Sequence, residues 1–377
     1  MAGEDDCGEN DYMNMRFSCV GGGSLDLDQA YTDRIFRRIA TLRRGPSYFP
    51  EYPLKKGSPV ENRLMIGILV SGLLVLVVAP IAAHAGQEQA TVGTSNLSYI
   101  TVSESVVMLE NLKVHGSNIT CLATDDGLVF VDCGLFTDIA ARFRKDMEAR
   151  FERKTLALFL THGHTDHFFG MGAFADVPVV AAAAEKPLFE HQLSIDFQSH
   201  VEGYKRIFPL FDQALETASP FAPTKWFDEE MTFGTGESRV IIRRTGGHTA
   251  GCSYALMTSQ GILVAGDNVQ VEQYPYFGDR TGDMTVWIET LEHWEGMDLQ
   301  NICPGHGRVV GAAYVTAVRE YYQKLVAVLE KLKSEDVPVQ EAVSHPDLPE
   351  GYWPEDLEKP GWFEPAVAGL YRSLGTE

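Results

Sequence analysis

Thr161-His162-Gly163-His164-Thr165-Asp166-His167 places three imidazoles and one carboxylate within six residues. The apolar run at 156–160 comes directly before this stretch and is typical of a buried strand. In an extended segment, side chains two positions apart point to the same side, so His162 and His164 can face a common point. Imidazole nitrogens and carboxylate oxygens are ligands that borderline cations such as zinc prefer. The stretch therefore predicts a metal site at the end of a strand.

Three later motifs repeat the combination of glycine with histidine or aspartate. They are Gly246-Gly247-His248-Thr249, Ala265-Gly266-Asp267 and Pro304-Gly305-His306-Gly307, which follow the apolar runs at 240–242, 262–264 and 301–303. Glycine lets the backbone turn sharply and approach its neighbours closely. We therefore expect four strand ends to bring these histidine and aspartate side chains together.

In kind and order, the four motifs resemble those of the metallo-β-lactamase superfamily, over about residues 98 to 330. The resemblance implies an α/β (α+β) fold, the four-layer αββα sandwich. The pattern of elements agrees with this fold, because two sets of strands, each followed by helices, predict two packed sheets under outer helices. The predicted strands include 119–124, 179–182 and 253–257, and the predicted helices include 140–152, 285–294 and 313–333.

The resemblance implies seven ligands for two metal ions: His162, His164 and His248 for the first, Asp166, His167 and His306 for the second, and Asp267 as a bridge. Two zinc ions are the expected cofactors, with iron or manganese as alternatives. Asp166 is also the expected catalytic residue, because it can orient the nucleophile. Thr161, Thr165 and Thr249 are candidates to hold the imidazoles, and Asp132 is expected either to orient the first metal loop or to cap a helix.

The residue type at position 267 distinguishes branches of this superfamily. Enzymes that open β-lactams typically carry cysteine there or lack the bridging carboxylate, whereas aspartate resembles the thioesterase, lactonase and phosphodiesterase branches. Two cations lower the pKa of a shared water and give hydroxide near neutral pH, which attacks an acyl or phosphoryl centre. We therefore expect a hydrolase of small-molecule esters, thioesters, lactones or phosphodiesters, and not a true β-lactamase.

Two other functions agree with the same ligands. Some superfamily members hold iron, so a mononuclear-iron sulfur (persulfide) dioxygenase is one alternative, which iron content and oxygen uptake would reveal. A non-catalytic metal-binding protein is the second, and it would retain zinc without turning over any ester-type substrate.

The segment before the metal motifs predicts export. Residues 65–85 read MIGILVSGLLVLVVAPIAAHA, an apolar core that Pro80 interrupts, followed by the small-x-small site Ala83-His84-Ala85. Basic residues precede it at Lys55, Lys56 and Arg63. By the positive-inside rule this flank stays in the cytoplasm and the histidine-rich domain is exported. The segment is either cleaved as a signal peptide or kept as a single transmembrane anchor, since a span needs about 20 apolar residues.

Five regions are expected along the chain. They are a poorly structured extension at 1–64, the apolar segment at 65–85, a linker at 86–97, the catalytic domain at 98–335 and a tail at 336–377 that packs on the domain. The aromatic stretch at 191–230 predicts a lid or a small helical core, and the loop at 273–280 is expected at the rim of the site.

The net charge bears on the class of substrate, and the cysteine spacing bears on disulfide bonds. The formal net charge is −21, with the acidic excess concentrated after residue 85. A field of this sign repels polyphosphates, so a small-molecule substrate is favoured over nucleic acid. The six cysteines include no CxxC pair and are irregularly spaced, so no disulfide framework is indicated.

Overall fold

The computed structural model of this chain describes residues 87–92, 95–110, 116–195, 199, 202 and 218–374. The predicted extension at 1–64, the apolar segment at 65–85 and most of the aromatic stretch between 196 and 217 lie outside the described residues. Within the described ranges, no helix combines the length and hydrophobicity needed to cross a bilayer.

The first sheet holds eight strands, arranged in sequence order. They are β1 (Gln87–Val92), β2 (Ser95–Thr101), β3 (Val106–Glu110), β4 (Ile119–Thr124), β5 (Gly127–Val131), β6 (Thr155–Phe159), β7 (Val179–Ala182) and β8 (Lys225–Phe227). Neighbours from β1 to β5 pair antiparallel, whereas those from β5 to β8 pair parallel. A parallel pair needs a crossover connection, and helix α2 (Thr137–Phe151) provides it between β5 and β6.

The second sheet has five strands. Across the sheet their order is β13 (Asn301–His306), β12 (Ile262–Gln270), β11 (Ser253–Met257), β10 (Val240–Arg244) and β9 (Glu230–Phe233). The pairs from β9 to β12 are antiparallel, and β12 and β13 are parallel. Parallel pairing brings the carboxyl ends of β12 and β13 to the same edge, where two of the four motifs lie.

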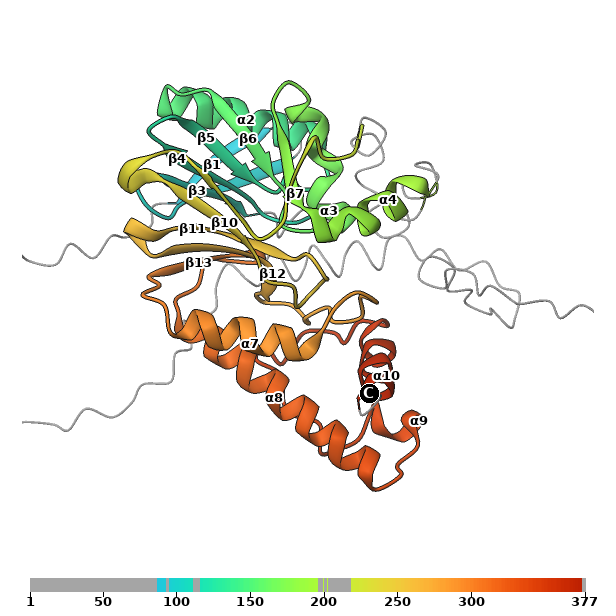
Figure 1. The fold of residues 1–377 in the computed structure, drawn as a ribbon. Coiled ribbons are helices and arrows are strands. Elements are labelled where there is room, and N and C mark those ends of the chain that lie inside the picture. The colour runs from blue at the N-terminus through green and yellow to red at the C-terminus, as the bar shows by residue number, and fades with distance from the viewer. Residues whose placement is uncertain are drawn as a thin grey trace, which may run out of the picture. The chain divides into compact units, whose positions relative to one another are not determined.

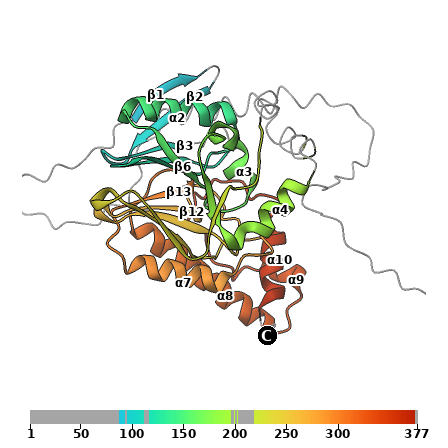
Figure 2. The same cartoon turned by 45° about the horizontal axis from the view of Figure 1, so that its top comes forward.

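The two sheets face each other, and helices cover their outer faces (Figures 1 and 2). A buried apolar cluster between the sheets includes Met108 and Phe159 of the first sheet and Ile242 of the second. A second cluster packs α2 on the outer face of the first sheet, and a third packs α7 (Met284–Glu295) and α8 (Ala313–Ser334) on the second sheet. The fold is therefore mixed α/β with two sheets between helices, as the αββα prediction requires.

Other helices of the described part are short or lie near the edges. They are α3 (Thr165–Phe168), α4 (Lys186–Ser194), α9 (Val339–Ala342), α10 (Phe363–Ser373) and the 3-10 helices η2 (Phe169–Phe174), η3 (Ala183–Glu185), η5 (Gly236–Ser238) and η6 (Thr258–Gln260).

Helical periodicity explains how the outer helices pack. Ile139, Phe143 and Met147 recur every four residues on α2 and are buried against the first sheet. On α7, Trp287 and Trp294 lie two turns apart and are fully buried. Burying one large apolar side chain contributes about 1.5–3 kcal/mol, so packing of the apolar stripe holds each helix to its sheet.

Residues 87–92, which we expected within a linker at 86–97, form β1 instead, and β2 begins inside the same range. The polar sequence QEQATV does not predict a strand. An edge strand needs only backbone pairing on one side and tolerates polar side chains, and Gln87 to Val92 pair in register with Ile100 to Ser95. The domain therefore begins before residue 98.

The C-terminal segment, predicted as a tail at 336–377, packs on the domain. Phe363 and Tyr371 of α10 join the buried cluster around α8. The Tyr371 hydroxyl donates to the Val337 carbonyl at 2.6 Å, and Lys333 Nζ donates to the Tyr371 carbonyl at 3.1 Å. Apolar burial and these hydrogen bonds together hold α10 in place.

Candidate metal centre

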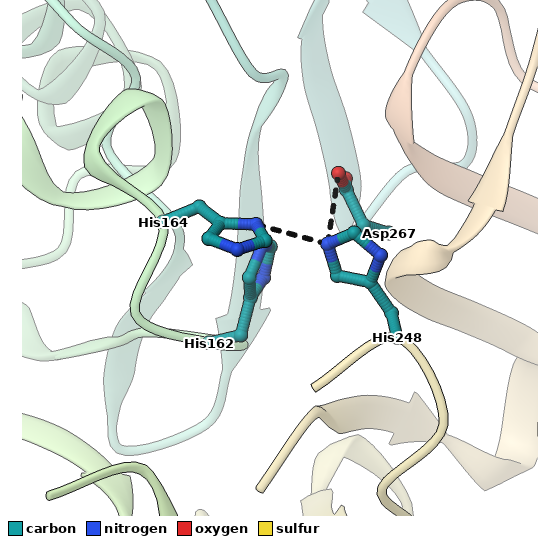
Figure 3. A group of neighbouring side chains, drawn as sticks. All are labelled: His162, His164, His248 and Asp267. Carbon is teal, nitrogen blue, oxygen red and sulfur yellow. Dashed lines mark hydrogen bonds and ion pairs between the residues drawn. The ribbon is translucent and has the colours of Figure 1, made fainter. Parts of the chain in front are cut away.

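The seven residues singled out in the sequence come together in two groups. The ligand-type atoms within each group lie within 4.8 Å of one another: His162, His164, His248 and Asp267 form the first group, and Asp166, His167 and His306 form the second. Figure 3 shows the first group, with the three imidazoles and the carboxylate facing a common point.

Strands and the loops that follow them deliver these side chains. His162 and His164 lie in the loop between β6 and α3, and His167 lies in α3. His248 lies between β10 and β11, Asp267 lies within β12, and His306 is the last residue of β13. The first sheet thus supplies the HxHxDH motif and the second sheet supplies the other three.

Three imidazole nitrogens of the first group face one another. His164 Nδ1 lies 3.0 Å from His162 Nε2 and 3.0 Å from His248 Nε2. His248 Nε2 also lies 3.6 Å from Asp267 Oδ2. A neutral imidazole has one N–H and one lone pair, so a ring that donates outward presents its lone pair to the centre.

The outward nitrogens of four rings have polar partners. The pairs are His162 Nδ1 with Thr161 Oγ1 at 3.0 Å, His164 Nε2 with Asp279 Oδ2 at 2.9 Å, His248 Nδ1 with the Tyr276 carbonyl at 2.9 Å, and His167 Nδ1 with Asp132 Oδ2 at 2.8 Å. Such partners fix the tautomer and the orientation of histidine ligands. Each ring is therefore set to present its other nitrogen inward.

The second group adjoins the first through Asp267. His306 Nε2 lies 3.3 Å from Asp166 Oδ2 and 3.4 Å from Asp267 Oδ2. His167 Nε2 lies 3.2 Å from Asp267 Oδ1. One oxygen of Asp267 therefore faces His167, and the other faces His306 and His248.

Two buried atoms at this centre, His167 Nε2 and Asp267 Oδ1, have no hydrogen-bond partner among the described residues. Leaving such an atom unsatisfied costs about 1–3 kcal/mol. Burial opposes a charge on His167, but the carboxylates of Asp267, Asp132 and Asp166 outweigh it and raise the pKa of His167 well above its usual range, so a cation bound at Nε2 would replace a proton there. A divalent cation would satisfy both atoms, so the donor set fits metal ions that imidazole and carboxylate bind.

Burial and neighbouring charges determine the protonation of the group. Burial lowers the pKa of His248 to about 4, and burial with the neighbouring imidazoles holds the pKa of His162 well below its usual range. Burial also opposes a charge on His306, but Asp267 and Asp166 outweigh it and raise the pKa of His306 to about 9. His162 and His248 are therefore neutral near pH 7, which is the form of imidazole that binds metal.

Close contacts explain the glycines beside two of the ligands. A Cβ atom at position 305 would lie 1.9 Å from Asp267 Oδ1, and one at position 266 would lie 2.8 Å from Thr161 Oγ1. Gly266 also has a φ of +54°, a conformation that residues with a Cβ rarely adopt. Only glycine at these positions lets the motifs meet.

The structure decides between the two roles considered for Asp132. Its carboxylate accepts hydrogen bonds from the Thr161 backbone N–H and hydroxyl, both at 2.8 Å, and from His167 Nδ1. It therefore orients the first metal loop. Thr161 also contacts His162, as expected, whereas the Thr249 hydroxyl donates to Glu185 and not to an imidazole.

Glu185, which no sequence motif marks, ties two metal loops together. Its Oε2 accepts from the Gly163 N–H at 2.8 Å, and its Oε1 accepts from the Gly251 N–H at 2.6 Å and the Thr249 hydroxyl at 2.7 Å. Gly163 lies between His162 and His164. A single acid with no neighbouring motif gives no signal in the sequence.

Asp279 and Asn268 were not singled out in the sequence either. Asp279 holds His164, and Asn268 Oδ1 accepts from the His248 backbone N–H at 3.0 Å. Only the position of Asn268, directly after Asp267, could have pointed to the site. The loop at 273–280 does reach the site, where the Tyr276 ring packs on His164 at 5.9 Å and on His248 at 6.1 Å between ring centres.

Access to the centre is uneven. The side chains of Asp166, His164 and His306 are 23%, 17% and 14% exposed, whereas His162, His167 and His248 are buried. Solvent therefore reaches the centre beside the three partly exposed side chains.

One solved structure of low sequence identity shares the fold, and a second is reported beside it for its coverage. The sec-alkylsulfatase Pisa1 from Pseudomonas sp. is 17% identical with a TM-score of 0.54, and the match covers 74% of this chain and 50% of that chain. A metallo-beta-lactamase from Pontibacter korlensis is 18% identical with a TM-score of 0.45, and the match covers 63% of this chain and 99% of that chain. The chain thus spans about half the length of the alkylsulfatase.

Comparison with curated proteins gave no match. A family model described as the metallo-beta-lactamase superfamily matches residues 112–306, which is more than half of the chain and contains all seven candidate ligands. On this match, the chain belongs to the metallo-β-lactamase superfamily.

Proposed function

We propose that this protein is a metal-dependent hydrolase that binds two divalent cations, zinc in the simplest case. The observation that carries the proposal is the convergence of seven imidazole and carboxylate side chains in two adjoining groups. In the proposed assignment, one ion is held by His162, His164 and His248, the other by Asp166, His167 and His306, and Asp267 is shared.

Divalent cations at such a pair of sites make water more acidic and polarise a carbonyl or phosphoryl oxygen. The chain's own residues would then orient the nucleophile. Asp166 is the most exposed member of the centre, and its Oδ2 lies 3.3 Å from His306 Nε2. In this proposal Asp166 accepts a hydrogen bond from the attacking water and holds it toward the substrate.

The proposed substrate is a small molecule with an ester, thioester, lactone or phosphodiester bond. Aspartate at position 267 supports these classes over β-lactams, on the resemblance stated above. The net charge of −21 works against polyanionic substrates. Because one structural neighbour is a sec-alkylsulfatase, a secondary alkyl sulfate belongs in the same substrate panel.

The proposal is tested by elemental analysis of the purified chain together with this substrate panel. We expect about two zinc ions per chain and turnover of at least one ester-type substrate. His164→Ala and His306→Ala should each lose turnover and bind less zinc while circular dichroism shows an intact fold. Iron with oxygen uptake on a persulfide would instead identify a dioxygenase. Retained zinc without any turnover would identify a binding protein.

We propose further that residues 65–85 export the domain, either as a cleaved signal or as a membrane anchor with a cytoplasmic N-terminus. The apolar core, the preceding basic residues and the small-x-small site support this assignment. Fractionation of cells that express the full chain tests it. Activity in the soluble cytoplasm would contradict it, and the mass of the mature chain separates cleavage from anchoring.

A further inference from the structure

His164 differs from the other rings of its group in the nitrogen that it presents. His164 turns Nδ1 toward the centre, whereas His162 and His248 turn Nε2. Its outward Nε2 lies 2.9 Å from Asp279 Oδ2. Asp279 lies in the loop between β12 and α7, far from the HxHxDH motif in sequence, and its side chain is 12% exposed.

Both carboxylate oxygens of Asp279 have defined partners. Oδ2 faces His164, and Oδ1 accepts from the Thr281 backbone N–H at 2.7 Å and from the Thr281 hydroxyl at 2.6 Å. Two acceptor oxygens are therefore in use at once. An asparagine has one acceptor oxygen, so it could satisfy Thr281 or His164 but not both.

The loop that carries Asp279 also holds His248. The Tyr276 carbonyl accepts from His248 Nδ1 at 2.9 Å. Further along, the Asp283 backbone N–H donates to the Gly247 carbonyl at 2.8 Å. One loop thus supports, from outside, two of the three imidazoles of the first group.

The C-terminal segment also packs on this loop, through Trp362 and helix α10. The rings of Tyr276 and Trp362 are 5.2 Å apart and nearly perpendicular, at 82°. A Cβ atom at Gly278 would lie 3.3 Å from the Ala366 Cβ, so the loop backbone approaches α10 closely. Tyr274 adds a ring contact with Phe363 at 4.9 Å.

We propose that Asp279 is a positioning residue that fixes the tautomer and ring angle of His164, and that Trp362 of the C-terminal segment holds the Asp279 loop against the centre. Without an acceptor at Nε2, the imidazole proton can move to Nδ1, where it would occupy the lone pair that faces the centre. This inference rests on the proposed metal-dependent function, and it adds a part of the chain outside the four motifs to the site.

The test compares metal affinity and metal-free stability in the full chain. Wild type and Asp279→Asn are titrated with Co²⁺ against a chelator, and the visible absorption of Co²⁺ reports the ligand geometry. Asp283→Asn is the matched control, because Asp283 lies in the same loop and caps α7 through Thr285 and Val286, where asparagine serves equally well. Thermal unfolding of each metal-free protein measures any loss of fold.

We expect Asp279→Asn to bind one ion about 10–100-fold more weakly with an altered Co²⁺ spectrum, while its metal-free melting temperature stays within about 4 °C of wild type. Asp283→Asn should match wild type in affinity and spectrum. Wild-type affinity in Asp279→Asn, or a loss of affinity explained by a collapsed metal-free fold, would overturn the positioning role. If the wild type itself binds no Co²⁺ or Zn²⁺, the proposed function fails first.

A second pair of variants tests the contribution of the C-terminal segment. Trp362→Ala should lower the affinity for Co²⁺, as Asp279→Asn does. Trp362→Phe keeps a ring against Tyr276, so its affinity for Co²⁺ should equal that of wild type. Equal affinities in Trp362→Ala and wild type would remove the C-terminal segment from the proposal.

Discussion

At the scale of single residues, the centre depends on side chains that hold the ligands as much as on the ligands. Asp132, Asp279 and the Tyr276 carbonyl each accept from the outward nitrogen of one imidazole. The ligands could be predicted because they stand in short motifs beside glycine at strand ends. Among the holding residues, Asp132 was predicted as one of two alternatives, whereas Asp279 and Glu185 could not be predicted, since they approach the motifs only through tertiary contacts.

Replacing Glu185 tests this division of roles. Glu185→Gln loses one acceptor oxygen, so at least one of the Gly163, Gly251 and Thr249 donors is left buried without a partner. We expect the free energy of unfolding to fall by about 1–3 kcal/mol in urea denaturation. Glu190→Gln, on the exposed face of α4, should stay within about 1 kcal/mol of wild type, and equal effects of the two variants would refute the role of Glu185.

Gly305 packs closely against the Asp267 carboxylate. An added Cβ would lie 1.9 Å from Asp267 Oδ1, so Gly305→Ala must displace either the carboxylate or the β13 backbone. We expect elemental analysis to show loss of at least one metal ion per chain. Gly311→Ala is the control, because a Cβ there meets no atom within 4 Å, and full metal content in Gly305→Ala would contradict the packing argument.

Among the strands, the sequence predicted the bounds of several buried strands correctly but did not predict the polar edge strand β1. β4, β7 and β11 have the predicted bounds, because each is apolar and ends at a turn or loop. β1 was missed because an edge strand pairs through its backbone and carries no apolar pattern. The strand that begins with the apolar run at 262–264 continues as β12 through Asp267 to Gln270, so the carboxylate lies within the sheet.

The buried apolar stripe of helix α7 contributes to the stability of the fold. Trp294 is fully buried in the cluster beneath α7 and α8, so Trp294→Ala should lower the free energy of unfolding by about 3–5 kcal/mol. The adjacent His293 is exposed. His293→Ala should therefore change the free energy of unfolding by less than about 0.5 kcal/mol. Denaturant unfolding of the two variants measures the difference, and a similar small effect of both would mean that α7 does not depend on this burial.

At the scale of the whole molecule, the centre joins both sheets and the C-terminal segment. His162 and His164 follow a strand of the first sheet, Asp267 and His306 lie in strands of the second, and α10 packs on the loop that holds His164. The two-sheet architecture was predictable from the order of strands and helices. The contact between α10 and the site was not, because it joins an aromatic tail to a loop with no shared motif.

Because ligands from both sheets would share the ions, metal removal should destabilise the entire domain. A ligand that binds only the folded state at a thousand times its Kd stabilises by about 4 kcal/mol. We therefore expect dialysis against a chelator to lower the melting temperature and zinc to restore it. In His164→Ala the melting temperature should respond less to zinc, and a wild-type melting temperature that ignores both treatments would argue against a shared centre.

The most direct measurement is an anomalous difference map from crystals of the zinc-loaded protein, collected at the zinc absorption edge. We expect two peaks, one among His162, His164 and His248 and one among Asp166, His167 and His306, with Asp267 in contact with both. Peaks elsewhere, or imidazoles turned away from a common centre in zinc-loaded crystals, would contradict this expectation.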